Sequence, residues 1–227
     1  ATIHEEWHIN GRDMIPTRVV RAKKILEGLK DKRAFISGSF LYAKHYNDID
    51  IFIIGNSRKQ YREGKKNFIY ITESDLQLPL FYSCVQYCVA NHAVREIEPI
   101  LKRPAFDEIL LTYQLTIKEI LDREDEKTLR SLIFLYYISV EEVILDSCTL
   151  HKEFLQIKAI SKQEKIKKIN AMVKEMFLCL FSPRYTEEVL RPFIKDINED
   201  ISRYKNNQAL LLSHHLLEEI KNECRRD

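Results

Sequence analysis

Two aspartates and a Gly-Ser pair are the residues of this chain whose types and spacing best suit chemistry. They lie within residues 34–55, which read AFISGSFLYAKHYNDIDIFIIG. Asp48 and Asp50 lie in an apolar run and are separated by one residue, so a β-strand would project both carboxylates from one face, about 7 Å apart. Crowded carboxylates on a buried strand lose solvation and repel each other, and a cation relieves both costs. Mg²⁺ fits best, because it takes carboxylates together with substrate phosphates.

The Gly-Ser pair predicts a small anion-binding site beside these aspartates. Gly38 tolerates a positive φ and lets the main chain approach a ligand closely. Ser39 offers a hydroxyl and a backbone N–H at the predicted start of a helical turn over residues 40–43. Lys44, in the following loop, is a candidate to neutralise phosphate charge, although most loop lysines are simply solvated.

Strands and one helix must position these groups. Short apolar runs predict strands over residues 34–36, 48–54 and 67–72, and helical spacing of apolar residues predicts a helix over residues 17–29. Residues 56–66 are rich in lysine and arginine and predict a polar connection with hairpin character near Glu63-Gly64.

This order of strand, Gly-Ser, short helix and Asp-x-Asp strand resembles the nucleotidyltransferase superfamily of DNA polymerase beta, kanamycin nucleotidyltransferase and the minimal nucleotidyltransferases. The resemblance covers roughly the first third of the chain. It implies that Gly38 and Ser39 hold the triphosphate of a nucleoside triphosphate, and that Asp48 and Asp50 bind two Mg²⁺ ions. The eight residues between Ser39 and Asp48 form a shorter connection than is common in the minimal members.

A third carboxylate, on a later strand in this family, has one weak candidate here. Glu73 lies at the exit of the predicted strand 67–72 and shares the face of Asn67, Ile69 and Ile71 by alternation. In the family this acid serves as general base for the attacking hydroxyl and completes one metal site. The resemblance therefore implies that role for Glu73.

Composition excludes several classes of protein. The 227 residues are 45% hydrophobic and 31% charged, which is typical of a globular protein with a real core. The net charge is only +2, so any nucleic-acid contact must come from a local patch. Because no apolar run reaches about 18 residues and no signal-peptide pattern occurs, we expect neither a membrane span nor export. Five cysteines without a regular framework favour the reducing cytoplasm.

The remainder of the chain predicts helices. We expect them over residues 80–92, 106–122, 126–150, 162–180, 193–204 and 209–224, with Ser161 opening one through a capping box. One stripe of the helix expected over residues 80–92 would carry Cys84, Cys88 and His92. These three side chains would be spread too far along the helix axis to bind a single metal ion. The predicted fold is α+β: a small mixed nucleotidyltransferase sheet with flanking helices over residues 1–98, then a helical bundle over residues 99–227.

Two further patterns carry weaker functional interpretations. The lysines at 162, 165, 167, 168 and 174 form the densest basic surface, which is either a solvated helix face or a contact for RNA or another acidic partner. His4-Glu5-Glu6-Trp7-His8 satisfies the H-E-x-x-H zinc pattern, but a zinc site needs both histidines on a long buried helix. We interpret it as a chance match.

Taken together, the residues and the resemblance predict an Mg²⁺-dependent nucleotidyltransferase. It would move a nucleoside monophosphate from a nucleoside triphosphate to a hydroxyl of RNA, protein or a small molecule. One alternative is a protein of the same fold that has lost catalysis and only binds nucleotide or RNA. Another is a helical interaction protein in which the aspartate pair is incidental.

Overall fold

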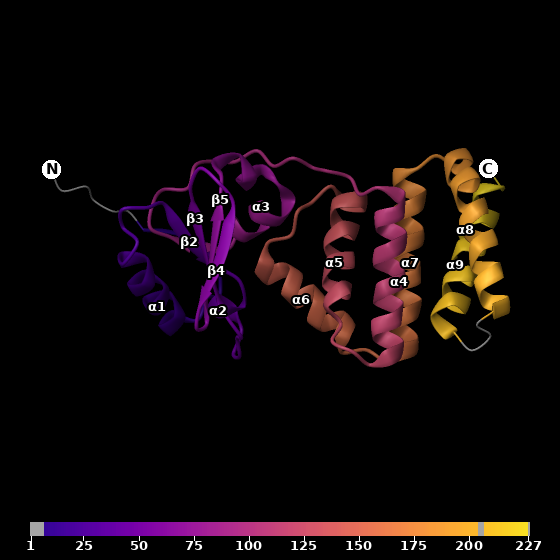
Figure 1. The fold of residues 1–227 in the computed structure, drawn as a ribbon, viewed down its shortest axis with the longest axis horizontal. Coiled ribbons are helices and arrows are strands. Elements are labelled where there is room, and N and C mark those ends of the chain that lie inside the picture. The colour runs from indigo at the N-terminus through magenta and orange to yellow at the C-terminus, as the bar shows by residue number, and fades with distance from the viewer. Residues whose placement is uncertain (1–6, 204–206, 227) are drawn as a thin grey trace. The chain divides into compact units, whose positions relative to one another are not determined.

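The computed structural model describes residues 7–203 and 207–226. It divides the chain into two compact units (Figure 1). The first contains residues 1–102 and 144–151, and the second contains residues 103–143 and 152–227. The division after residue 102 falls close to the predicted boundary at 98, but the short segment 144–151 returns to the first unit, which no local pattern indicated.

The first unit is built on an open, six-stranded mixed sheet, so the predicted α+β class holds in its general form. The strand order is β1-β6-β2-β3-β5-β4, and β3 and β5 are parallel whereas the other neighbours are antiparallel. The strands are β1 (His8–Asn10), β2 (Ala34–Ser37), β3 (Ile49–Ile54), β4 (Lys59–Glu63), β5 (Lys66–Ile71) and β6 (Cys88–Ala90).

Each face of this sheet has its own apolar layer. Alternation along β3 sends Ile49, Ile51 and Ile53 to one face, where they pack with Ala22 and Leu26 of α1 (Pro16–Glu27). We call this the α1 face. Phe52 lies on the other face, which is covered by the 3₁₀ helix η1 (Glu73–Gln77) and by α3 (Pro79–Val85). We call this the α3 face.

One predicted element of the first unit is wrong, and another is only partly right. The helix over residues 80–92 ends at Val85, and Cys88-Val89-Ala90 form β6, which lies between β1 and β2. A short apolar run fits a helix or a buried strand equally well, and pairing with two neighbours decides for the strand. The hairpin character predicted near Glu63-Gly64 is confirmed, but residues 59–63 are an edge strand of the sheet rather than a polar connection, because their main chain pairs with β5 although all five residues are exposed.

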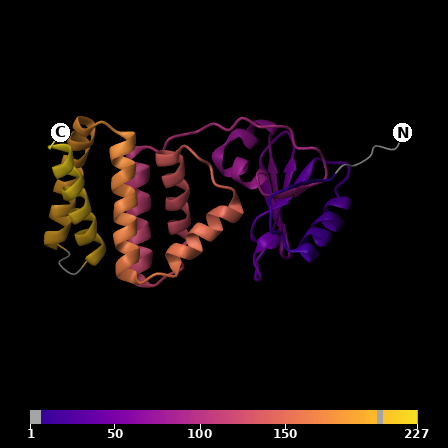
Figure 2. The same cartoon turned by 180° about the vertical axis from the view of Figure 1, so that it is seen from behind.

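The second unit is helical, and Figure 1 shows α4, α5 and α7 side by side. Its core contains the fully buried Tyr113, Leu132 and Phe177, and the Phe106 ring lies 4.6 Å from that of Phe177. Figure 2 shows the same helices from behind. They are α4 (Phe106–Asp122), α5 (Lys127–Tyr136), the π-helical turn η2 (Tyr137–Glu141), α7 (Lys162–Leu180), α8 (Pro183–Arg203), α9 (Gln208–Cys224) and the part of α6 (Ser147–Lys158) from residue 152 onward.

The single helix predicted over residues 126–150 is interrupted. Glu142 adopts a left-handed backbone with φ of 55°, which ends the helical run that α5 begins. The Asp146 carboxylate accepts hydrogen bonds from the Thr149 N–H at 2.9 Å and from its hydroxyl at 2.7 Å, which opens α6. The predicted cap at Ser161 is confirmed, since its hydroxyl accepts from the Glu164 N–H at 3.3 Å.

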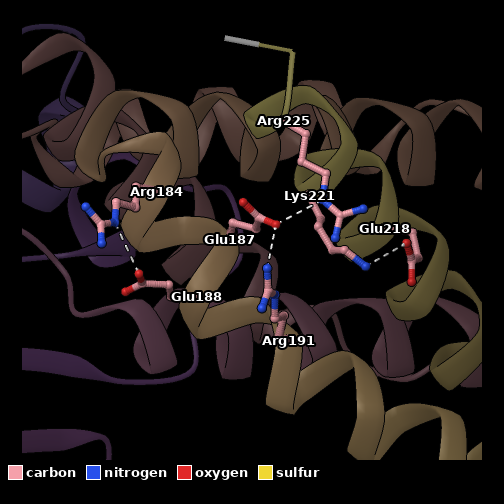
Figure 3. Close-up of polar contacts among 7 residues, drawn as sticks. All are labelled: Arg184, Glu187, Glu188, Arg191, Glu218, Lys221 and Arg225. Carbon is pink, nitrogen blue, oxygen red and sulfur yellow. Dashed lines mark hydrogen bonds and ion pairs between the residues drawn. The ribbon is translucent and has the colours of Figure 1, made fainter.

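Helices α8 and α9 pack against each other and exchange charged contacts. Glu187 on α8 accepts from Arg191, one turn away, at 3.0 Å and from Arg225, just after α9, at 2.9 Å (Figure 3). The two arginines lower the pKa of Glu187, Arg225 more strongly. Lys221 and Glu218 form a second pair along α9. Only the Arg225–Glu187 pair joins the two helices, and such partly exposed pairs contribute little to stability.

Candidate functional site

The aspartate pair lies at the start of β3, on the α3 face of the sheet. Asp48 directly precedes the strand and Asp50 is its second residue. Ile49 and Ile51 are fully buried on the α1 face, so alternation directs both carboxylates to the opposite face. The predicted common face of the two aspartates is therefore present.

The turn at Gly38 adjoins the Asp50 carboxylate. Gly38 has φ of 94° and ψ of -170°, a conformation that is essentially confined to glycine. A Cβ atom built on it would lie 3.4 Å from Oδ2 of Asp50. This proximity arises because Ser37, the last residue of β2, pairs in register with Asp50. The fold thus brings the Gly-Ser turn and the aspartates together, and Ser39 begins the short helix α2 (Ser39–Tyr42).

Asn67 completes the surroundings of Asp50. It is the register partner of Asp50 on β5, and its side-chain amide donates to Asp50 Oδ1 at 2.9 Å. The Asn67 carbonyl oxygen in turn accepts from the Gln60 amide at 2.8 Å. This chain of hydrogen bonds holds the Asp50 carboxylate in one orientation. The polar residue inside an apolar strand was the signal for Asn67, but no partner could be assigned to it from spacing alone.

Arg62 is the second group that pattern reasoning missed. Its guanidinium donates to Oδ2 of Asp48 at 3.1 Å. Arg62 is on β4, and its register partner is Asn67, which places it on the α3 face with the aspartates. The site therefore contains one fixed positive charge beside two carboxylates.

The Asp50 carboxyl group is electrostatically strained. Burial raises its pKa above the ordinary value, and the neighbouring charge of Asp48 raises it further. The hydrogen bond from Asn67 and the charge of Arg62 act in the opposite direction without cancelling the shift. A carboxylate held in this way gains from a cation more than an exposed one does.

Glu73 does not join the aspartates. It begins η1, after the end of β5, whereas Asn67 lies near the start of that strand. Its carboxylate pairs with Arg33 at 2.6 Å, at the end of the sheet away from Asp50. Glu73 lies beyond the end of β5, as predicted, but it pairs with Arg33 there and does not reach Asp50, so it is not the third acid of this site.

Lys44 and Cys84 contribute less than their residue types suggest. Lys44 is exposed, and its carbonyl oxygen accepts from Arg18 at 3.1 Å, while its ammonium group makes no ion pair within the described residues. Cys84 lies on α3; burial, followed by the charge of Asp50, raises the pKa of its thiol to about 12. That thiol stays protonated at neutral pH and is a poor nucleophile.

The oxygen atoms of Asp48, Asp50 and Asn67 fit a hard cation that also binds a ligand. Across residues 7–203 and 207–226, no cluster of three or more histidine, cysteine or acidic side chains could hold a metal ion by itself. Two carboxylates with an adjacent amide are oxygen donors of the kind that Mg²⁺ uses when phosphates supply the remaining positions. Asp48 and Asp50 are the residues that would hold such an ion.

The predicted basic surface on α7 is smaller than its sequence indicates. Lys165 is buried and pairs with Glu126 at 2.7 Å. Lys174 pairs with Glu219 at 2.8 Å and with Glu223 at 2.9 Å. The zinc-like pattern at residues 4–8 begins outside the described residues, and His8 at its end lies in β1.

No helix in the part of the chain that the structure describes is long and apolar enough to cross a bilayer. Comparisons with protein-family models, with curated proteins and with solved structures find no match to this chain.

Proposed function

We propose that this protein binds an Mg²⁺-nucleoside triphosphate at the Gly38–Asp50 site and transfers its nucleoside monophosphate to an acceptor hydroxyl. The observation that carries the proposal is the 3.4 Å separation between the Cβ position of Gly38 and Oδ2 of Asp50. At this separation the main-chain turn at Gly38, which a ligand can approach closely, lies directly beside the partly desolvated carboxylates of Asp48 and Asp50. A phosphate and its counter-ion need that juxtaposition.

Each residue has a defined part in this proposal. Asp48 and Asp50 hold the ion, and Asn67 fixes the orientation of Asp50. The backbone and hydroxyl of Ser39 bind phosphate oxygens, and Arg62 adds a positive charge that a planar guanidinium can share with phosphate. Mg²⁺, when bound, neutralises charge on the triphosphate and lowers the pKa of the acceptor hydroxyl.

Asn67 favours a second candidate, a protein that binds nucleotide without turnover. An amide occupies the position on β5 that faces Asp50 directly, and Glu73 lies at the other end of the strand. An amide cannot take a proton from an attacking hydroxyl at neutral pH. Binding through Asp48 and Asp50 does not depend on such a base.

Thermal unfolding with and without Mg²⁺ and each of the four nucleoside triphosphates tests binding. A ligand at about 100 times its Kd stabilises the native state by about 2.7 kcal/mol. We expect an Mg²⁺-dependent rise in Tm that is lost in Asp48→Asn and Asp50→Asn. The exposed Asp31→Asn is the control for loss of one negative charge. An equal response in all variants would show that the site is elsewhere, and no response in any would favour the interaction protein.

Transfer is tested separately with labelled nucleoside triphosphates, Mg²⁺, total RNA and cell lysate. Label on RNA, protein or a small molecule that is lost in Asp50→Asn establishes the transferase and its acceptor class. Intact binding without transfer establishes the second candidate.

A further inference from the structure

We propose that the outer part of the α1 face, at the free β4 edge of the sheet, binds single-stranded nucleic acid. We call this surface the Tyr61 strip. It consists of alternating cationic and aromatic side chains on β4, β5 and the adjoining loops: Lys32, Tyr46, Lys59, Tyr61, Lys65 and Tyr70. The inference is independent of nucleotide binding, because Asp48 and Asp50 lie on the α3 face.

The aromatic rings of the strip form a stacked series at the sheet edge. Tyr61 stacks on Phe68, its register partner, with ring centroids 4.9 Å apart and planes 16° apart. It also stacks against Tyr70 at 6.2 Å. Tyr61 remains 41% exposed on a strand whose five residues are all exposed. An exposed ring that already stacks on a neighbouring ring can serve as a platform on which a nucleobase stacks.

Lysines lie against two tyrosines of the strip, Tyr70 and Tyr46. Lys59 Nζ lies 4.2 Å from the Tyr70 ring centroid and Lys65 Nζ lies 5.0 Å from that of Tyr46. Lys32 donates to the Tyr70 hydroxyl at 3.3 Å. Within the described residues, none of these three ammonium groups has a carboxylate within 4.0 Å. Their charge is therefore available to a phosphate backbone, which supplies most of the affinity in nucleic-acid binding.

The length of the strip suits an extended chain rather than one phosphate. Lys65 directly precedes β5 and Tyr70 lies on it, and the five steps of about 3.3 Å between them extend over about 16 Å. Glu63 on the same face of β4 and Asp31 beside Lys32 are the acidic residues close to the strip. Residues 56–66 carry five basic residues and this one glutamate. Arg58 and Arg62 pair with Asp75 and Asp48 away from the strip, so Lys32, Lys59 and Lys65 are its cations and exceed the two acidic residues nearby.

A protective role for the edge explains only part of this arrangement. Lysines on an edge strand prevent pairing with other chains. That role does not require three stacked rings or an exposed tyrosine at their outer end. Stacking between charges is the pattern that sequence-tolerant binding of single strands uses.

Fluorescence anisotropy with a labelled oligouridylate of about 20 nucleotides, a matching DNA strand and a duplex RNA tests the proposal at about 50 and 200 mM salt. We expect the single strands to bind without added nucleotide. Tyr61→Ala should weaken binding by about 5- to 150-fold, the loss that one stacked base accounts for, whereas Tyr61→Phe should retain it. Lys59→Ala/Lys65→Ala should lower the slope of log K against log salt by about 1.4.

The matched control is Lys167→Ala/Lys168→Ala, which removes the same charge from exposed positions on α7. It should bind as the wild type does, and Asp50→Asn should as well, even if nucleotide binding is lost. The proposal would be overturned if the wild type did not bind, if both double variants lost the same affinity, or if Tyr61→Ala had no effect. Equally strong displacement by polyglutamate would identify an acidic protein as the ligand and would also overturn it.

Discussion

The side-chain amide of Asn67 donates a hydrogen bond of 2.9 Å to Oδ1 of Asp50, across the parallel pair of β5 and β3. This contact joins the two strands at the candidate site. It also places a neutral group where a third carboxylate would complete an acidic cluster.

Replacing Asn67 with aspartate should make the site both less stable and more responsive to Mg²⁺. The variant loses a donor and places a third negative charge against Asp50, a change that costs about 1–3 kcal/mol without a cation. We expect Mg²⁺ alone to raise its Tm by more than it raises that of the wild type. Asn67→Ala, which loses the donor but adds no charge, should show no such gain. Equal responses to Mg²⁺ in both variants would contradict this account.

Asp50→Asn should stabilise the protein at neutral pH. The pKa of Asp50 is raised in the folded state above its ordinary value of 3.8, so ionisation favours the unfolded chain. In the wild type, the contribution of Asp50 to the free energy of unfolding falls as the pH rises from 3.8 through the folded-state pKa. Above that pKa the contribution stays constant. The variant should therefore have a higher Tm than wild type at pH 7 and no advantage at pH 3. A lower Tm at pH 7 would mean that the charged carboxylate contributes net stability.

Gly38→Ala should destabilise the fold and impair ligand binding together. Alanine at φ of 94° is strained by about 1–3 kcal/mol, and its methyl group would contact Asp50. Gly64→Ala is the control, because Gly64 also has a positive φ of 59° but has no atom within 4 Å of its Cβ position. We expect about 1–2 kcal/mol for that substitution and an unchanged nucleotide response. Urea unfolding and the Mg²⁺-nucleotide shift in Tm measure the two effects.

The second unit should depend on one buried ion pair. Lys165 and Glu126 are 8% and 12% exposed, and Oε2 of Glu126 has no hydrogen-bond partner among the described residues. Lys165→Met would leave that carboxylate buried and unpaired, at a cost of about 3–5 kcal/mol. Adding Glu126→Leu should recover most of the loss. Urea midpoints of the single and double variants measure the coupling, and additive losses would show that the two residues act independently.

Both local and tertiary information were needed to predict the site. Alternation alone placed Asp48 and Asp50 on one face, because the side-chain period of a strand depends on nothing beyond the strand. The expected role of Glu73 beside the aspartates was wrong, because the register between β3 and β5 pairs Asp50 with Asn67 and leaves Glu73 at the other end of the strand. Register is a property of two strands, and a run of apolar residues does not specify it.

The same distinction between local and tertiary information explains which helices and strands were predicted correctly. Helices α4 and α9 and the cap at Ser161 agree with their predictions, because a helix satisfies its own hydrogen bonds within one segment. Strand β6 was predicted as a helix, and β4 was predicted only as a connection with hairpin character, since each becomes a strand only through its neighbours in the sheet.

The sequence by itself determined the α+β class, the acidic face of β3, the Gly-Ser turn before α2 and most helices of the second unit. Those features follow from local propensity and periodicity. Only the tertiary structure decided that Asn67 and Arg62 meet the aspartates and that Tyr61 stacks among lysines on the other face. These contacts join strands through sheet register, and register depends on the packing of the whole sheet.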